Sequence, residues 1–302
     1  CSTAVGYLNP IKHRKNLKII TQAHIKNIEF ENNKAVSVNY WQGNQLKKVK
    51  ANIEIILSAG SIGSPHILQA SGIGPGELLK KNNVEVIKDQ PAVGKNLQDH
   101  LMLRPVYKIK NLDTLNEAYH SLFKKMFIGI NYFILRKGPL TMGASHLCGF
   151  IKSDEYLETP NLQFHVSPMS TDILGQTTLH KFPAFTPTIC NIKPTSRGSV
   201  ELNGSDTRTD PKITMNYLSS PEDREIAAKA IKITRKIVME SNAFKPYEPS
   251  ELRPGIDYIS TEQSDVYKGL TKMQHDHFDY QNDDATWAPT LSNVSVLLTP
   301  IY

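Results

Sequence analysis

The first hundred residues alternate between apolar and polar positions with a period of two, interrupted by turn residues. Residues 24–30 and 34–41 alternate in this way on either side of Asn32 and Asn33, a pair typical of a tight hairpin turn. Residues 46–52 can add a third strand after a Gly-Asn turn. The pattern therefore predicts a small antiparallel meander. Further short strands are expected at residues 17–21 and 84–87.

Residues 53–58 ("IEIILS") are apolar with almost no alternation, which is typical of a parallel strand buried on both faces. The next residues, "AGSIGSPHILQASGIG", predict a short helix. Ser64 would be its N-cap and Pro65 its first residue, where the missing N–H of proline is harmless. Gly72 would supply the left-handed residue that ends it. The predicted unit is a buried strand, a glycine-containing turn and a helix.

From about residue 104 the pattern changes to longer elements. Residues 121–138 have apolar positions at helical spacing and end at a Gly-Pro pair. A second helix is predicted at 221–240, with Ser220 as its N-cap and an apolar face made by Ile226, Ala230, Ile233 and Ile237. Strand candidates separated by polar and proline turns predict an antiparallel sheet from residues 146–151, 162–167, 186–193 and 199–202.

Composition and charge favour a globular protein over a membrane-spanning or nucleic-acid-binding one. The 302 residues are 39% hydrophobic and 21% charged, as in globular domains, and contain no apolar run long enough to cross a bilayer. The net charge of +6 comes from scattered lysines, whereas a nucleic-acid-binding protein concentrates its charge on one face, so nucleic acid is not an expected partner. Because the chain begins with Cys1 instead of methionine, we interpret it as an internal piece of a longer protein.

The cysteines bear on location and on metal binding. Cys1, Cys148 and Cys190 are widely spaced, which argues against a disulfide scaffold or a structural zinc site and fits a reducing compartment. We therefore expect a cytoplasmic protein, with peripheral attachment at the inner membrane as the alternative.

The stretch from Leu57 to Gly74 has the features of a ligand-binding corner. A strand that passes through a glycine turn into a helix N-terminus presents free backbone N–H groups and the positive end of the helix dipole, which bind anions and nucleotides. Gly60 and Gly63 would let a ligand approach the main chain closely. A plain strand-to-helix connection fits the same residues, and no GxGxxG fingerprint occurs in the chain. The corner alone leaves both interpretations open.

Several stretches resemble, in order, the glucose–methanol–choline (GMC) family of flavin oxidoreductases. "GSIGSPHILQASGIG" (60–74) is similar to the second signature of that family, and "VGKNLQDHL" (93–101) to its GxNLQDH segment. Residues 2–30 and 193–225 resemble the segment before that signature and the start of the C-terminal domain. The resemblance covers about residues 2–255 and looks closest to bacterial choline and alcohol dehydrogenases.

The resemblance implies an α/β fold (α+β overall), with a partial Rossmann-like FAD-binding domain containing a β-meander and a substrate domain built on an antiparallel sheet. The implied divisions are the C-terminal part of the FAD-binding domain (1–103), the substrate domain (104–220), a helix and the start of the return to the FAD domain (221–260), and a divergent tail (261–302).

The resemblance also implies that FAD is the cofactor and suggests which residues lie near it. The backbone at Ile25 would lie by the adenine, Ala59, Gly60, Ser64 and Pro65 would lie along the cofactor, and Asn96 and Leu97 near the flavin. His146 and His165 are candidates for the substrate cavity, although each could instead be a packed sheet histidine.

The general base of the family is a histidine in an HPxGTCxMG-like segment, which accepts the alcohol proton while hydride moves to the flavin. After about Ser260 this chain does not match that segment, so no catalytic residue is assigned. His275 and His277 lack its Pro-x-Gly-Thr context. A metal cluster of these two histidines with Asp279 and Asp283 is disfavoured, because such period-two histidines are common on protein surfaces.

Three further positions have structural interpretations. Arg197 is expected to bond main-chain carbonyls at a turn, and Tyr217 to lie in the core. Asp99 and His100 are not expected to form a catalytic dyad, because neighbouring side chains on an extended segment point apart.

The sequence thus predicts an incomplete and by itself inactive part of an FAD-dependent oxidoreductase that oxidises a primary alcohol or choline to the aldehyde, with an unassigned electron acceptor. A non-catalytic GMC-like scaffold is the alternative, and an NAD-binding protein is disfavoured by the meander. A choline enzyme needs an aromatic or acidic cage, for which the aromatic candidates are Phe164, Phe182 and Phe185.

Overall fold

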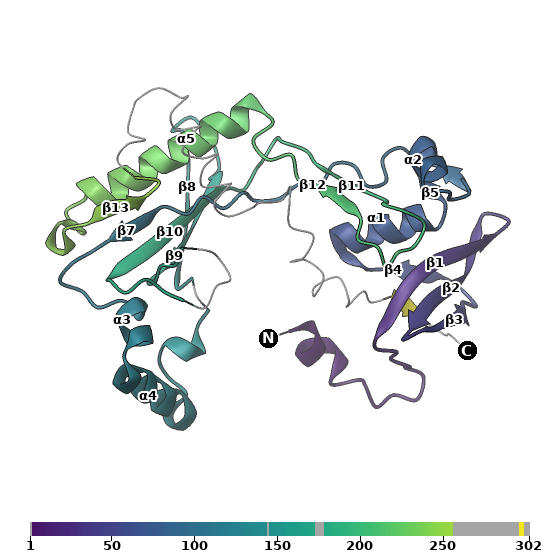
Figure 1. Ribbon diagram of the computed structural model, residues 1–302, viewed down its shortest axis with the longest axis horizontal. Coiled ribbons are helices and arrows are strands. Elements are labelled where there is room, and N and C mark those ends of the chain that lie inside the picture. Colours follow the sequence, from purple (N-terminus) through teal and green to yellow (C-terminus); the bar gives the residue numbers. More distant parts are fainter. Residues whose placement is uncertain (1, 144, 173–177, 256–295, 299–302) are drawn as a thin grey trace. The chain divides into compact units, whose positions relative to one another are not determined.

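The computed structural model describes residues 2–143, 145–172, 178–255 and 296–298 of the chain (Figure 1). These residues belong to two compact units. The first contains the residues up to Gln98 together with Arg197–Asn216 and residues 296–298, and the second contains Asp99–Ser196 together with residues 217–255. Each unit is therefore assembled from segments that are far apart in the sequence. The mixture of helices and antiparallel sheets confirms the predicted fold class.

The first unit contains the predicted meander. Its strands β1 (Ala23–Glu31), β2 (Lys34–Gln42) and β3 (Gln45–Lys50) pair antiparallel in the order β1-β2-β3. Asn32 and Asn33 have φ angles of 49° and 63°, the left-handed conformation that a tight hairpin turn requires. The buried side chains of the meander pack against Ile67 of helix α1; they are Ile25, Ile28, Val38 and Tyr40.

Helix α1 (Gly60–Ala70) begins earlier than predicted. Ala59 is the N-cap residue, Pro65 lies inside the helix, and the Ser64 hydroxyl accepts a hydrogen bond from the Ala59 N–H at 3.0 Å. The prediction that Ser64 is the N-cap is therefore wrong, because Gly60, with φ of +80°, already lets the chain turn into the helix. Gly72 has φ of +84°, which confirms the predicted left-handed residue after the helix.

The strand after the meander differs from its prediction. β4 (Ile55–Leu57) is partly exposed and pairs antiparallel with β14 (Val296–Leu298), so it is not a parallel strand buried on both faces. Its apolar run signals a need for burial but does not specify the direction of its partner, which comes from a distant segment.

The other expected short strands are also displaced. Residues 17–21 form no strand, and residues 84–87 precede the strand β6 (Lys88–Asp89) instead of forming it. The remaining elements of this unit are η1 (Ala4–Leu8), β5 (Ile73–Gly74), α2 (Gly76–Lys81), β11 (Ser199–Glu201) and β12 (Lys212–Thr214).

The second unit is built on a five-stranded antiparallel sheet in the order β13-β7-β10-β9-β8. Three of its strands confirm predicted ones: β8 (Leu147–Ile151), β9 (Leu162–Ser167) and β10 (Ala184–Asn191). The other two, β7 (Val106–Lys108) and β13 (Ser250–Arg253), are too short to give a period-two signal.

Helix α5 (Pro221–Arg235), continued by η4 (Lys236–Glu240), lies across one face of this sheet (Figure 1). The Ser220 hydroxyl accepts from the Asp223 N–H at 3.0 Å, as predicted for the N-cap. The fully buried face is, however, shifted from the predicted aliphatic positions, because small side chains let the helix approach the sheet closely. Its residues Ala227, Ala228, Ala230 and Ile231 pack against Leu162, Phe164 and Ile189.

The predicted helix at 121–138 is divided into α4 (Leu122–Ile130) and the π-helical turn η2 (Asn131–Leu135). Its large apolar side chains are exposed, and we call them the α4 surface: Leu122, Phe123, Met126, Phe127, Ile130, Phe133 and Ile134. α3 (Leu115–His120) precedes it, and the short turns η3 (Pro139–Thr141) and η5 (Lys245–Tyr247) complete the unit. In the described parts of the chain, helices are too short or too polar to cross a membrane.

Candidate functional site

The N-terminus of α1 forms an open corner in the first unit. Ala59 has no side chain that could cap the helix, and Gly60 and Ser61 are exposed. Gly60 has φ of +80°, and a Cβ atom built on it would meet no atom within 4 Å. The first N–H groups of a helix lack intrahelical acceptors and carry the positive end of the helix dipole. This corner can therefore receive a polar or anionic group close to the main chain.

Ile25 lies in β1, in the same unit as the corner. It is buried, and its carbonyl oxygen accepts a hydrogen bond of 2.7 Å from the Thr207 hydroxyl. The Thr207 carbonyl oxygen is in turn 2.8 Å from His24 Nε2. The loop at Thr207 therefore covers this part of β1, so an approaching ligand would not find the Ile25 carbonyl oxygen unoccupied. The predicted position of Ile25 beside adenine remains a prediction.

Asn96 and Leu97 also lie in the first unit. Asn96 is exposed with φ of +63°, and its side-chain oxygen accepts a hydrogen bond of 2.9 Å from Arg197 Nε. Leu97 exchanges two backbone hydrogen bonds with Gly198, of 3.1 and 2.8 Å. The sequence predicts bonds from Arg197 to main-chain carbonyls, whereas its Nε donates to a side-chain carbonyl. Asn96 is thus held in position by a charged partner.

Gln69 connects α1 to the segment that contains Asn96. Its side chain is fully buried, donates to the carbonyl oxygens of Val93 (3.2 Å) and Val200 (3.0 Å), and accepts from the Leu202 N–H (2.7 Å). This junction joins the α1 candidates (Ala59, Gly60, Ser64 and Pro65) to the neighbourhood of Asn96 and Leu97. The sequence pattern missed Gln69, because glutamine in a helix is usually exposed.

His66 is a second buried polar side chain of α1. Burial lowers its pKa to about 4, and its Nε2 atom has no hydrogen-bond partner among the described residues. Its imidazole is consequently neutral near pH 7. It lies on the buried side of the helix and does not contribute charge to the open corner.

In the second unit, one face of the sheet carries polar side chains. Alternate side chains of a strand point to opposite faces, and Leu162, Phe164 and Ile189 point to α5. The opposite face, which we call the polar sheet face, therefore carries mostly polar side chains and one exposed aromatic ring: His146, Cys148, Phe150, Gln163, His165, Ser167, Thr186, Thr188 and Cys190. The two predicted cavity residues, His146 and His165, lie on this same face, and their roles remain predictions.

Cross-strand contacts organise the polar sheet face. His165 is paired in register with Cys148 on β8 and with Thr188 on β10, and Gln163 Nε2 donates to Cys148 Sγ at 3.3 Å. Burial raises the pKa of the Cys190 thiol to about 11, with a smaller contribution from the charge of Asp99, so this thiol stays protonated near pH 7. The face thus presents hydroxyl, amide, thiol and imidazole groups together with the ring of Phe150. The sequence signal that could have found it is the period-two placement of polar residues in β9 and β10.

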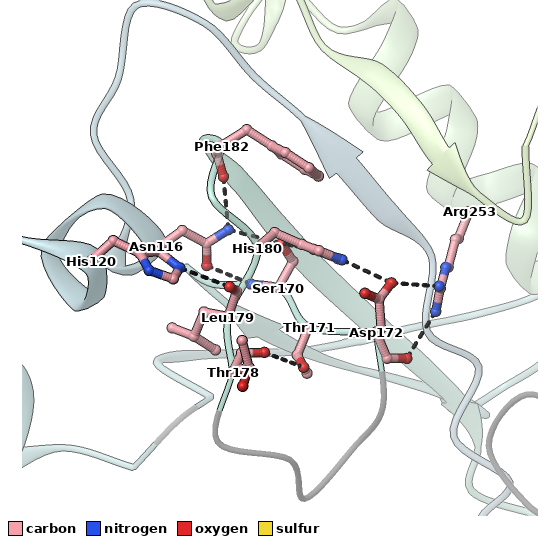
Figure 2. A network of polar contacts seen from close by, with 10 residues as sticks. All are labelled: Asn116, His120, Ser170, Thr171, Asp172, Thr178, Leu179, His180, Phe182 and Arg253. Atoms are coloured by element: carbon pink, nitrogen blue, oxygen red, sulfur yellow. Dashed lines mark hydrogen bonds and ion pairs between the residues drawn. The ribbon is translucent and has the colours of Figure 1, made fainter.

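A serine, a histidine and an aspartate form a chain of hydrogen bonds beside this sheet (Figure 2). His180 Nδ1 is 2.8 Å from the Ser170 hydroxyl, and His180 Nε2 is 3.0 Å from Asp172 Oδ1. This order is that of a nucleophilic triad. Ser170 is, however, only 1% exposed, and its hydroxyl also accepts a hydrogen bond of 2.9 Å from Asn116 Nδ2. A substrate has no access to it, so the network is structural.

The remaining predicted polar residues have structural partners as well. Tyr217 packs partly against the sheet core, as predicted, and its hydroxyl donates to Asp99 Oδ2. This hydrogen bond joins Asp99 to Tyr217, whereas a catalytic dyad would join it to His100. His275, His277, Asp279 and Asp283 lie outside the described residues. Within the described ranges, histidine, cysteine and acidic side chains form no group that could hold a metal ion.

Comparison with known families gives two matches. The N-terminal model of a family described as GMC oxidoreductase matches residues 1–102, and its C-terminal model matches residues 194–290. The second match continues past residue 255, where the motifs recognised in the sequence end.

The curated proteins that match this chain include bacterial choline dehydrogenases. The chain is 36% identical over 266 residues to an oxygen-dependent choline dehydrogenase of Pectobacterium carotovorum and 37% identical over 268 residues to one of Chromohalobacter salexigens. Each alignment covers 88% of this chain but 47% of the relative. The chain therefore spans about half the length of the curated relatives that it matches.

Solved structures with the same fold include two oxidases of low sequence identity. A formate oxidase variant from Aspergillus oryzae RIB40 matches with a TM-score of 0.77 at 21% identity, over 88% of this chain and 50% of that one. Pyridoxine 4-oxidase from Mesorbium loti matches with a TM-score of 0.73 at 23% identity, over 90% and 48%. These similarities establish the fold.

Proposed function

Because the chain belongs to the GMC oxidoreductase family, we propose that it is part of an FAD-dependent enzyme that oxidises a primary alcohol to the aldehyde. The observation that carries this proposal is the open corner at Gly60, where an uncapped helix N-terminus meets free space beside a glycine of positive φ. The curated relatives are choline dehydrogenases, and the formate oxidase structure is that of a variant made to study FAD modification. Both support the choice of cofactor and reaction.

The described residues fit the cofactor in the first unit. The α1 N–H groups would bind a polar edge or a phosphate of FAD, and Gly60 would allow close approach. Asn96, held by Arg197, would contact the cofactor from the segment joined to α1 through Gln69. When bound, FAD accepts the hydride that leaves the alcohol. We assign no described residue as the base that accepts the alcohol proton.

In the second unit, the polar sheet face is the surface proposed to contact the substrate. The polar sheet face offers hydroxyl, amide and imidazole groups that can donate to or accept from an alcohol hydroxyl. His146 and His165 are the residues proposed to contact the substrate, because they lie on this face and are only partly buried. The electron acceptor that reoxidises the flavin remains unassigned.

We expect the full-length protein to be yellow and its flavin absorbance to fall when a primary alcohol is added. We expect the Gly60→Val variant to retain less flavin than the wild type. A Cβ atom at Gly60 would meet no protein atom within 4 Å, so the new side chain would enter the space proposed for the cofactor; the positive φ of +80° adds backbone strain, which the control shares. The measurement is the flavin-to-protein ratio of the purified protein. Gly43→Val is the matched control, because Gly43 also has a positive φ (+59°) and open space, but lies in a hairpin turn.

Full flavin content in Gly60→Val would remove Gly60 from the cofactor site. A folded, colourless wild-type protein would contradict the enzymatic function as a whole and favour the non-catalytic scaffold. Equal unfolding temperatures of Gly60→Val and Gly43→Val would show that flavin loss does not come from unfolding.

We further propose that the α4 surface attaches the protein to an anionic membrane surface. Leu122 and Phe123 are 81% and 82% exposed, and residues 121–142 carry Lys124, Lys125, Arg136 and Lys137 but no acidic residue. Apolar side chains flanked by cations are the combination that binds anionic lipid headgroups and the outer acyl region. One of the cations, Lys124, forms an exposed ion pair with Asp113, which salt and lipid headgroups can displace.

The full-length protein is therefore expected to sediment with vesicles that contain phosphatidylglycerol and not with pure phosphatidylcholine vesicles. Phe123→Glu should abolish sedimentation, because it places a carboxylate among anionic lipids. Tyr156→Glu is the control, since Tyr156 is equally exposed (80%) outside α4. If wild-type protein stays in solution with both vesicle types, the surface is covered by protein, either by the rest of the polypeptide or by a second copy.

A further inference from the structure

We infer that Arg197 is a positioning residue, which fixes the amide of Asn96 so that its NH2 group is left as a hydrogen-bond donor to the flavin ring. The inference rests on the proposed function, because it specifies how described residues act on the FAD proposed for the same site. It assigns a hydrogen-bonding direction to a residue that the family resemblance places only near the flavin.

The contact between the two side chains allows one orientation of the amide. Arg197 Nε donates to Asn96 Oδ1 at 2.9 Å. A guanidinium offers N–H donors and no acceptor, so the amide atom that faces it must be the oxygen. Turning the amide over would place its NH2 group against the guanidinium, with donors facing donors. The nitrogen is therefore the part of the amide that remains to contact a ligand.

The backbone on both sides of this contact is fixed by pairing. Leu97 exchanges two backbone hydrogen bonds with Gly198, of 3.1 and 2.8 Å, and the Val200 N–H donates to the Gly94 carbonyl oxygen at 2.7 Å. The two segments therefore run antiparallel beside each other. Because the two side chains project from paired segments, they meet without a loop having to move, and little entropy is lost when a ligand binds.

The main chain at Arg197 is also held from its other side. A Cβ atom at Gly198 would lie 2.2 Å from the Thr214 carbonyl oxygen and 2.8 Å from the Met215 carbonyl oxygen, so the backbone approaches closely here. Asn216 Nδ2 donates to the Arg197 carbonyl oxygen at 3.0 Å. These contacts involve main-chain atoms, which stay in place when the Arg197 side chain is replaced. Its substitution therefore tests the side chain and not the fold of the segment.

Asn96 is suited to present a donor at this position. It is exposed and has φ of +63°, a left-handed conformation that asparagine adopts more readily than most residues. Its oxygen meets the guanidinium while its nitrogen faces the ligand, whereas an ionised aspartate would offer acceptors only. The positive charge on its oxygen also polarises the amide, which makes the N–H groups stronger donors.

A donor at this position would favour the reduced form of the bound cofactor. The flavin ring has acceptor atoms, among them N1 and the two carbonyl oxygens, and reduction places negative charge on this part of the ring. A hydrogen bond from Asn96 Nδ2 to such an acceptor is stronger when the acceptor is charged. The midpoint potential of the flavin should therefore be higher with the contact between Arg197 and Asn96 than without it.

The test measures the midpoint potential of the flavin in the full-length holoenzyme. Arg197→Met should shift the reduction equilibrium about threefold toward the oxidised form, as expected for weakening one hydrogen bond, which is about 14 mV for a two-electron couple. Lys95→Met is the matched control, since Lys95 is an exposed cation beside Asn96 that pairs with Glu201 at 2.7 Å, and its loss should leave the potential unchanged. Equal potentials of wild type and Arg197→Met would overturn the inference.

A double-variant cycle tests whether Arg197 acts through Asn96. Asn96→Gly removes the amide and keeps the backbone, because glycine accepts a positive φ freely. It should shift the reduction equilibrium about tenfold, which is about 30 mV for a two-electron couple. In the Asn96→Gly background, Arg197→Met should cause no further change. An equal shift in both backgrounds would show that the guanidinium acts on the flavin directly, and the positioning role would be wrong.

Flavin content separates this inference from the proposed function. A folded wild-type protein without flavin would contradict the proposed function, and this inference with it. A wild type that holds flavin, together with an unchanged potential in Arg197→Met, would overturn the inference alone. Loss of flavin from Arg197→Met, with an unchanged potential in the fraction that keeps it, would also overturn it, because Asn96 would then bind a part of the cofactor other than the ring.

Discussion

Gly94→Ala is expected to destabilise the first unit by more than about 4 kcal/mol, or to prevent it from folding. Gly94 has φ of +84°, and a Cβ atom at this position would lie 2.1 Å from the Val200 carbonyl oxygen and 2.3 Å from Gln69 Nε2. Neither neighbour can move away, because the Val200 N–H donates to the Gly94 carbonyl oxygen at 2.7 Å and the Gln69 side chain is fully buried. The clash would fall on the junction that joins α1 to the Asn96 segment.

Urea unfolding followed by circular dichroism measures this effect, with Gly43→Ala as the control. Gly43 also has a positive φ, of +59°, but a Cβ atom there would meet no atom within 4 Å, so alanine should cost only about 1 kcal/mol of backbone strain. Similar midpoints for the two variants would show that the junction is not tightly packed. The flavin content of Gly94→Ala should fall together with its stability.

Asp223→Ala is expected to destabilise the second unit by about 3 kcal/mol. The Asp223 carboxylate is 5% exposed and accepts hydrogen bonds from the N–H groups of Thr195 (2.9 Å) and Ser196 (2.7 Å) and from Asn191 Nδ2 (3.2 Å). It therefore fastens the start of α5 to the end of the sheet. Alanine would leave these donors without the carboxylate, in a place where water has little access.

The same carboxylate gives the effect a defined pH dependence. Burial raises the pKa of Asp223, but the hydrogen bonds from Ser196 and Thr195 outweigh burial, and the net pKa lies below the ordinary value. A carboxylate whose pKa is lower in the folded state adds stability above its unfolded pKa of about 3.9 and loses it as the pH falls through the folded value. The difference in unfolding free energy between wild type and Asp223→Ala should thus be constant near neutrality and shrink below about pH 4.

Glu222→Ala serves as the control for this pair of measurements. Glu222 is the exposed neighbour of Asp223 in the first turn of α5, so its removal should change stability by less than about 0.5 kcal/mol. If the two variants behave alike, or if the effect of Asp223→Ala does not diminish in acid, the carboxylate does not hold α5 in the way described.

Local patterns were sufficient for many individual elements. The meander, β8, β9 and α5 follow from period-two alternation, a pair of asparagines and a Ser-Pro helix start, all of which act within a few residues of each other. The start of α1 could not be placed in this way. Ser64 and Pro65 form a good N-cap signal, but the positive φ of Gly60 and the hydrogen bond from the Ala59 N–H to Ser64 produce an earlier start.

Some residues of the candidate site could likewise be predicted from the sequence, and others could not. Gly60, Asn96, His146 and His165 could be selected from motifs and from the family resemblance. Gln69 and Gly94 could not, because a glutamine on a helix and a glycine in a loop have no pattern that marks them. Their importance comes from Val200, which is more than a hundred residues away in the sequence and in contact in the fold.

The order of residues was enough to identify the family, the mixed α and β class and the chemical type of the side chains in the candidate site. Hydrogen bonding along a strand or within a helix turn is local, so the order of side chains was enough to specify it. The folded chain was needed to show that β4 pairs with β14 and that Ser170 is too buried to be a nucleophile. It also shows that Phe164 and Phe185 are buried and that Phe182 stacks on His180. Burial and pairing depend on segments that meet only when the chain folds, and no local pattern specifies which segments those are.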